Sequence, residues 1–267
     1  MQKSHLLITG LLVVVLVALA WGARQMIAPE SDVESSELIE TGRAHLEAGE
    51  YAEAIADLNA AIEANPDSAE AHLLLGQAYN RTNDLLEAKD EFSTVLELDP
   101  ESSAAHHNLG VTYFQLGSLD AALAEFQVAL ELDPDAADTH YQLGVVYLNL
   151  SFPSGDAMAP PDPQLLEQAA GEFESALALK EGMLEARIGM ANIYILQANY
   201  SEAIEILQQV IEQKPDSLEA HYALGRAYTQ GGDTEKACQT YNHFLTLNPP
   251  QRWQDQVEKT IATLGCP

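Results

Sequence analysis

A spacing of 34 residues recurs along most of the chain and limits the folds that it can adopt. Glycines and prolines repeat at this step: Gly42, Gly76, Gly110 and Gly144; Pro66, Pro100 and Pro134; Pro215 and Pro249. Around four glycines the segments AHLLLGQAY, AHHNLGVTY, THYQLGVVY and AHYALGRAY keep one frame of small, apolar and aromatic residues. Self-similarity at this period is typical of a chain built from stacked copies of one supersecondary unit.

Each copy has the pattern of two packed helices. Leu75, Gly76 and Tyr79 lie at i, i+1 and i+4, on the helix face that meets a second helix. A small residue at the crossing lets the two backbones approach, and a large residue such as Phe92 fills the space beside it. The closing proline stands where the second helix must stop. One pair cannot bury its apolar face alone, so neighbouring pairs are expected to stack.

This frame resembles the tetratricopeptide repeat family, which has leucine-glycine, a tyrosine, then alanine, a large residue four positions on and a closing proline. The later positions are Ala88 and Phe92, Ala122 and Phe126, Ala169 and Phe173, and Ala237 and Tyr241. The resemblance implies an all-α fold, a right-handed α-solenoid of six helix pairs. The expected units are 35–68, 69–102, 103–136, 137–183, 184–217 and 218–251.

The ends of several helices can be predicted from single residues. Asp67 with Glu70, and Asp216 with Glu219, have the spacing of a capping box and predict helix starts. In the fourth unit Glu181 replaces the closing proline, and Gly182 is expected to cap the helix instead. After the last unit, Trp253, Val257, Ile261 and Leu264 share one face, so residues 252–267 predict a capping helix.

The stretch SFPSGDAMAPPDPQ interrupts the frame in the fourth unit. Its four prolines and one glycine exclude a regular element. Gly144 and the corresponding Ala191 are 47 positions apart instead of 34, so 13 residues, at about 151–163, are inserted. We therefore expect a loop between the two helices of one unit and no boundary between domains. Two roles stay open: a tolerated surface loop, or a second contact point beside a binding groove.

The first residues differ in kind from the repeats. After a five-residue tail, residues 6–23 (LLITGLLVVVLVALAWGA) carry no charge. This length lies between a secretory signal and a membrane-spanning helix, which needs roughly 18 apolar residues or more. Trp21 suits a membrane interface. We expect an uncleaved transmembrane signal anchor followed by a linker at 24–34. Cleavage near Ala20, giving a secreted protein, is the alternative.

The charge balance narrows the partners. The chain has 41 Asp and Glu against 12 Lys and Arg, a net charge of −29 at pH 7, which repels nucleic acid and favours neutral, apolar or cationic protein segments. The sequence shows no nucleophile–base pair, phosphate loop or zinc-type cysteine cluster. With residues 35 onward assigned to repeats and cap, no enzyme and no catalytic, cofactor or metal site are expected. The carboxylates are expected on solvated outer faces and turns.

Four histidines recur at the fourth position of the first helix: His72, His106, His140 and His221. Neighbouring helices lie roughly 10 Å apart, whereas zinc needs ligand nitrogens at about 2.0–2.1 Å. One such ladder cannot supply two ligands to one ion, so these histidines are expected to have packing roles.

Cys238 and Cys266 are the only cysteines. A capping helix that begins near Arg252 and runs antiparallel would bring Cys266 back toward the start of the last second helix, which holds Cys238. A disulfide there would fasten the end of the solenoid and would require an oxidising compartment. Two free thiols are the alternative.

In the tetratricopeptide family, positions five, nine and twelve of each first helix build a concave wall. The resemblance implies a partner-binding groove lined by Arg43, Leu73, Gln77, Asn80, His107, Val111, Phe114, Tyr141, Val145, Leu148, Ile188, Asn192, Tyr222 and Arg226. Ile39, Leu46, Ile195 and Thr229 hold the same positions. Phe114, Tyr141 and Leu148 are the expected apolar anchors. Only Arg43 and Arg226 are basic, so the family subtype that clamps carboxylate tails is not expected.

The resemblance implies a membrane-anchored scaffold or adaptor that mediates protein–protein interaction in cell-envelope complex assembly. Its place would be the inner (cytoplasmic) membrane of a bacterium, with the repeats on the extracytoplasmic side. The alternative is a periplasmic holdase-type chaperone for exported unfolded chains, for example in cytochrome c maturation or outer-membrane or pilus biogenesis. Architecture alone does not choose between these roles.

Overall fold

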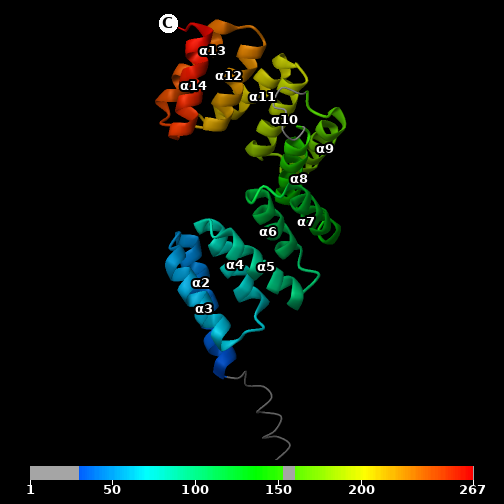
Figure 1. The fold of residues 1–267 in the computed structure, drawn as a ribbon, viewed down its shortest axis with the longest axis vertical. Helices are drawn as coiled ribbons and strands as arrows, with labels where there is room; N and C mark the ends of the chain where they lie inside the picture. Colours follow the sequence, from blue (N-terminus) through cyan, green and yellow to red (C-terminus); the bar gives the residue numbers. More distant parts are fainter. Residues whose placement is uncertain (1–29, 153–159, 267) are drawn as a thin grey trace, which may run out of the picture. The chain divides into compact units, whose positions relative to one another are not determined.

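The computed structural model describes residues 30–152 and 160–266, which form an all-helical fold without strands (Figure 1). The predicted anchor at 6–23 lies outside the described residues. None of the helices in the described part is long and apolar enough to cross a membrane. These helices are α2 (Glu30–Ala48), α3 (Tyr51–Ala64), α4 (Ala69–Thr82), α5 (Leu85–Leu98), α6 (Ser103–Gln115), α7 (Leu119–Leu132), α8 (Ala137–Leu150), α9 (Pro163–Leu179), α10 (Leu184–Leu196), α11 (Tyr200–Gln213), α12 (Leu218–Gln230), α13 (Thr234–Thr246) and α14 (Gln251–Leu264).

The helices pack in consecutive pairs, one pair in each repeat. The chain divides into two compact units, residues 1–100 with helices α2 to α5, and residues 101–267 with helices α6 to α14. Within each of these two compact units, the second helix of a pair also packs against the first helix of the next pair. The structure therefore shows a stacked run of two pairs and another of four pairs, the second closed by α14.

Glycine at the helix crossings is required by the rings that face it. A Cβ added to Gly76 would lie 2.6 Å from Cε1 of Phe92, and one added to Gly225 would lie 2.4 Å from Cε1 of Tyr241. Phe173 is approached from two sides, because a Cβ on Gly144 would lie 2.7 Å from its ring and one on Gly189 would lie 2.6 Å from it. This fully buried ring therefore fills the space between α8, α9 and α10.

Gly144→Ala should lower the free energy of unfolding by about 1–3 kcal/mol, because its methyl group would be forced against the ring of Phe173. The matched control is Gly171→Ala in the partner helix α9, where no described atom lies within 4 Å of the added Cβ. That change should raise stability by roughly 0.5–1 kcal/mol, since alanine is the better helix former. Urea unfolding followed by circular dichroism measures both variants, and effects of the same sign would contradict the steric argument.

Three predicted helix ends were wrong by one or two residues. Ser68 and Ser217, and not Asp67 and Asp216, are the N-caps: each serine hydroxyl accepts a hydrogen bond from the N–H three residues on, at 3.3 Å. The serines have the extended backbone that brings a side-chain oxygen to this N–H. At the other end, α9 stops at Leu179 and Lys180 is its C-cap, so Gly182 lies beyond the cap.

The predicted insertion begins and ends inside one helix pair. Helix α8 ends at Leu150 and α9 begins at Pro163, whose fixed φ suits a first helical residue. The carboxylate of Asp162 accepts a hydrogen bond from the N–H of Gln164 at 2.8 Å and so caps α9. The N–H of Asp162 donates to the carbonyl oxygen of Ser151 at 2.7 Å. The two ends of the insertion therefore meet, while residues 153–159 lie outside the described residues.

Helix α14 has the position of a first helix in a seventh unit. The amide of Gln256 donates to the hydroxyl of Tyr222, 34 positions earlier, at 2.6 Å. Trp253 packs against the rings of Tyr222 and Phe244, with centroids 5.4 and 5.9 Å apart. The positions that would face a second helix hold Glu258, Lys259 and Ala262, which are all exposed. This polar face ends the stack at α14.

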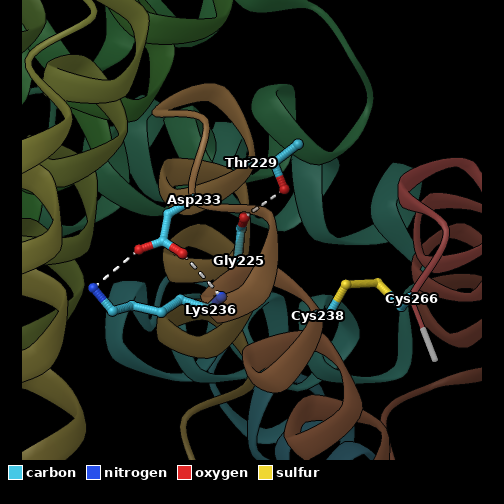
Figure 2. Close-up of a disulfide and its surroundings, with 6 residues drawn as sticks. All are labelled: Gly225, Thr229, Asp233, Lys236, Cys238 and Cys266. Carbon is cyan, nitrogen blue, oxygen red and sulfur yellow. Dashed lines mark hydrogen bonds and ion pairs between the residues drawn. A yellow bond between two sulfur atoms is a disulfide. The ribbon is translucent and has the colours of Figure 1, made fainter.

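A disulfide joins α13 to Cys266, the second residue after the end of α14. Figure 2 shows the bond between Cys238 and Cys266, whose Cα atoms are 5.6 Å apart. The pairing joins two segments that are 28 residues apart in the sequence. It therefore fastens the terminal helix to the last pair, in addition to the packing of Trp253 and the fully buried Val257.

Candidate functional site

The predicted groove residues fall on the first helices of the pairs and form two surfaces. The N-terminal wall consists of Arg43, Leu73, Gln77 and Asn80 on α2 and α4. The C-terminal wall consists of ten residues on α6, α8, α10 and α12: His107, Val111, Phe114, Tyr141, Val145, Leu148, Ile188, Asn192, Tyr222 and Arg226. Each of these fourteen side chains is half-buried. By contrast Ile39 and Ile195, at 6% and 1% exposure, belong to the core, so their assignment to the wall was wrong.

In the C-terminal wall, polar side chains link each first helix to another. Nδ1 of His107 on α6 lies 2.8 Å from Oγ1 of Thr139 on α8. Nη1 of Arg226 on α12 donates to Oδ1 of Asn192 on α10 at 3.3 Å. The apolar residues Val111, Phe114, Tyr141, Val145 and Leu148 pack their inner sides against one buried cluster. The wall is thus held in place from behind and along its length, which favours binding without rearrangement.

The basic residues of both walls already have partners. Arg43 forms an ion pair with Glu70, which begins the next first helix, and Arg226 is bonded to Asn192. The guanidinium of Arg43 is therefore neutralised by a carboxylate, whereas that of Arg226 is oriented by a neutral amide and keeps its charge.

A cavity of about 210 Å³ opens beside Tyr141 in the C-terminal wall. It is lined by Tyr141, Leu184, Glu185, Ile188, Lys214, Ser217 and Glu219. Burial raises the pKa of the Tyr141 phenol, and the nearby carboxylates of Glu185 and Glu219 raise it further. Within the described part of the chain neither carboxylate forms an ion pair. The cavity therefore has an aromatic and apolar base with two carboxylates that are available to a cation.

The carboxylates of this cavity were missed by sequence reasoning, which assigned acidic residues to outer faces and turns. Glu185 and Glu219 are indeed exposed, but they also line the cavity beside Tyr141, which was not predicted. A pattern was available, since Glu70, Asp138, Glu185 and Glu219 all hold the second position of a unit. Glu70 pairs with Arg43, and Asp138 acts on His107. An acid at this position therefore faces the wall residues of the preceding unit.

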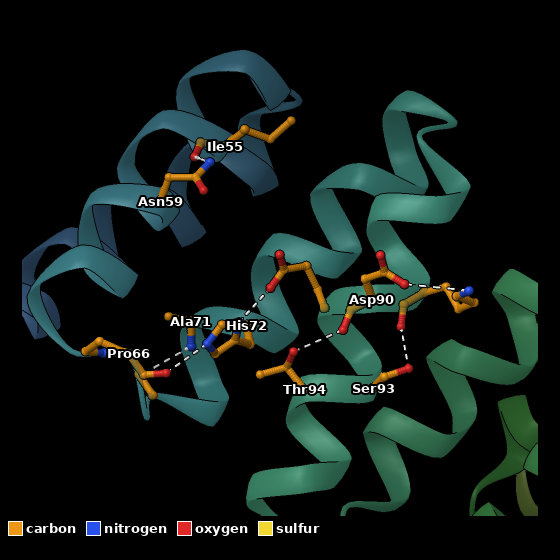
Figure 3. Close-up of polar contacts among 11 residues, drawn as sticks. Ile55, Asn59, Pro66, Ala71, His72, Asp90, Ser93 and Thr94 are labelled. Atoms are coloured by element: carbon orange, nitrogen blue, oxygen red, sulfur yellow. Dashed lines mark hydrogen bonds and ion pairs between the residues drawn. The ribbon is translucent and has the colours of Figure 1, made fainter.

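The histidine ladder has a packing role in three repeats, and Figure 3 shows the first of these histidines, His72. Nδ1 of His72 lies 2.6 Å from the carboxylate of Glu91, and its Nε2 lies 3.0 Å from the carbonyl oxygen of Pro66. His140 repeats this arrangement with Glu172 and Pro134 at 2.6 and 3.0 Å. Likewise His106 lies 2.7 Å from Glu125. These rings join a first helix to its own second helix and do not converge on one point.

His107 is a wall residue whose protonation is affected by its surroundings. Burial lowers the pKa of its imidazole below the ordinary value of 6.5, against a smaller opposing effect of Asp138. Its ring also packs edge-on against Phe126, with centroids 5.7 Å apart. Below pH 6.5 the unfolded chain therefore takes up a proton at His107 more readily than the folded chain does. The free energy of unfolding consequently decreases as the pH is lowered.

The variant His107→Gln tests this linkage. The free energy of unfolding of wild type minus that of the variant should be constant above about pH 6.5. It should decrease as the pH is lowered further, because only wild type must keep a buried imidazole neutral. Urea unfolding of both proteins at several pH values between about 5 and 8 isolates the contribution of His107, since the other histidines contribute equally to both proteins and drop out of the difference. A stability difference that does not change with pH would show that His107 titrates normally in the folded state.

The fold, the repeat frame and the comparisons agree on the class of protein. The family model for the tetratricopeptide repeat matches residues 45–109, 164–216 and 196–255, more than half of the chain. A second model of the same repeat matches residues 112–151. The chain belongs to the tetratricopeptide repeat family.

The chain spans only 8% of the length of the curated relatives that it matches. Cellulose synthase operon protein C of Escherichia coli (strain K12) is 34% identical over 99 residues, which are 37% of this chain and 8% of that protein. Among solved structures, pilF of Pseudomonas aeruginosa has a TM-score of 0.67 at 20% identity, over 85% of this chain and 100% of that one. YrrB, a repeat protein with an unusual peptide-binding site, has a TM-score of 0.54 at 23% identity, over 76% of this chain and 97% of that one. The structural likenesses show the fold.

Proposed function

We propose that this chain is a scaffold that captures an extended or helical segment of a protein partner on its C-terminal wall. The observation that carries the proposal is the half-buried apolar row of Phe114, Tyr141 and Leu148 beside the cavity at Tyr141. Half-buried aromatic and aliphatic side chains on a fixed surface are the usual anchors of peptide recognition. Peptide binding by YrrB, a relative in fold, supports the same use of this fold here.

The chemistry of the wall selects an apolar segment with a basic side chain. Val111, Phe114 and Val145 offer apolar contact. At the cavity, a lysine or arginine of the partner would lay its aliphatic stem against Tyr141 and Ile188 and place its charge between Glu185 and Glu219. The net charge of −29 would steer such a segment toward the protein.

The double variant Phe114→Ala/Tyr141→Ala should reduce recovery of the partner by crosslinking and pull-down at least about tenfold, because anchors of this kind commonly contribute 2 kcal/mol or more. The matched control is Leu132→Ala/Leu179→Ala, which removes two exposed apolar side chains from the second helices α7 and α9. The control should bind as wild type does. Undiminished recovery by the first variant at normal thermal stability would contradict the proposal.

Since Phe114 and Tyr141 also pack against the core, a variant that leaves the core intact completes this test. Glu185→Gln/Glu219→Gln keeps the size of both side chains and removes their charges. It should weaken binding most at low salt, where charge attraction is screened least. If wild type binds many unfolded chains and recovers no defined partner, and the variant loses this binding, the holdase alternative would be favoured over the scaffold.

We further propose that the chain is anchored by residues 6–23 and that its repeats lie outside the cytoplasm, where they serve assembly of a cell-envelope complex. Two observations support this location: the uncharged run of residues 6–23, and the disulfide between Cys238 and Cys266, since such bonds persist mainly in oxidising compartments.

A C-terminal alkaline phosphatase fusion tests the location, because this enzyme needs disulfides that form after export. We expect an active fusion in the membrane fraction. An active fusion that is released as a soluble protein would indicate cleavage near Ala20. An inactive fusion of normal abundance would place the repeats in the cytoplasm and overturn the proposed orientation.

A further inference from the structure

The histidine ladder changes its chemistry in the last unit. His72, His106 and His140 each lie beside a glutamate of the second helix, namely Glu91, Glu125 and Glu172. At the same position of the sixth unit the sequence has Thr240. His221 keeps its other contact, since its Nε2 lies 2.9 Å from the carbonyl oxygen of Pro215. Within the described part of the chain, Nδ1 of His221 has no carboxylate partner.

The contact with Pro215 determines which nitrogen of His221 is available. A carbonyl oxygen only accepts, so Nε2 must carry the hydrogen, and in the neutral ring Nδ1 then bears a lone pair. Burial lowers the pKa of His221, which keeps the ring neutral. A histidine that donates one N–H to a backbone carbonyl and presents the other nitrogen is oriented as metal-binding histidines are.

This ring lines a cavity and is itself almost fully buried, at 6% exposure. The cavity has a volume of about 540 Å³ and lies among α11, α12 and α13. Its lining residues are Gln208, Ile211, Glu212, His221, Leu224, Gln239, Thr240 and His243. Glu212 brings negative charge to the cavity, which favours a cation over an anionic ligand.

His243 supplies a second imidazole from outside the ladder. The rings of His221 and His243 have centroids 4.8 Å apart and planes at 67°. Two imidazoles bound to one tetrahedral zinc ion at Zn–N distances of about 2.0–2.1 Å have centroids roughly 5 Å apart. In the structure the two rings meet edge to face, and His243 is exposed, so rotation of its side chain can bring one of its nitrogens toward Nδ1 of His221.

We propose that His221 and His243 form a binding site for a divalent transition-metal ion such as Zn²⁺. The described residues contain no group of three histidine, cysteine, aspartate or glutamate side chains arranged to hold a metal ion, so the pair supplies two ligands and water supplies the others. Imidazole nitrogens prefer such an ion to Mg²⁺ or Ca²⁺, which prefer oxygen ligands. No metal site was expected from the sequence; the spacing argument concerned neighbouring ladder histidines, whereas this site joins one ladder histidine to His243, which lies outside the ladder.

The test is a titration of the full-length chain with Zn²⁺, read by competition with a chromogenic chelator. Millimolar Mg²⁺ is present throughout to occupy the many carboxylates, which a chain of net charge −29 offers to any cation. We expect one site that survives Mg²⁺. The variant His243→Gln should weaken it by about tenfold or more, because one of its two protein ligands is lost.

The matched control is His45→Gln, a change of the same kind on α2, in the other unit of the chain. It should leave the affinity for Zn²⁺ unchanged. Because His243 is exposed, its replacement is expected to leave the fold intact, and circular dichroism checks this directly. Equal affinity of wild type and His243→Gln, or displacement of all bound Zn²⁺ by Mg²⁺, would overturn the proposal.

Discussion

The contact between a glycine of each first helix and a large side chain of its partner helix determines the spacing of almost every pair. At Gly76, Gly110 and Gly225 the opposing ring occupies the space that any Cβ would need. This contact brings the two backbones together, and the ring then fills the gap beside the crossing. Because, within each of the two compact units, a second helix also packs against the next first helix, a displacement at one crossing would also shift the neighbouring pair.

The same contact explains why the wall is available for binding. Its side chains stand on first helices that are fixed from behind by the aromatic residues, as Tyr141 is against Phe173 at 6.0 Å between centroids. The cross-links from His107 to Thr139 and from Arg226 to Asn192 hold the surface along its length. A segment that binds there meets a surface with little conformational freedom left to lose.

The helix pairs could be predicted from the sequence because glycine, the large residue and proline recur in phase, and their physical roles are local. Interactions between units were harder to predict. The position of Glu185 near Tyr141 depends on how consecutive first helices are offset, which the spacing of a single unit does not contain. The caps were misplaced by one residue because Asp67 and Ser68 both suit a helix start, and it is the hydroxyl of Ser68, on an extended backbone, that accepts the capping hydrogen bond. Ile195 was assigned to the wall by its position in the repeat, yet its side chain turns into the core.

The hydrogen bond from Asp162 to the carbonyl oxygen of Ser151 has a consequence for how this chain can vary. The ends of the insertion are held together whatever its length, so the register of α8 and α9 does not depend on the residues between them. For a flexible loop, each doubling of length costs only about 0.6 kcal/mol in closure entropy. The turn of the fourth unit is therefore a place where the chain can gain or lose residues while the stack, and the wall on its first helices, keeps its geometry.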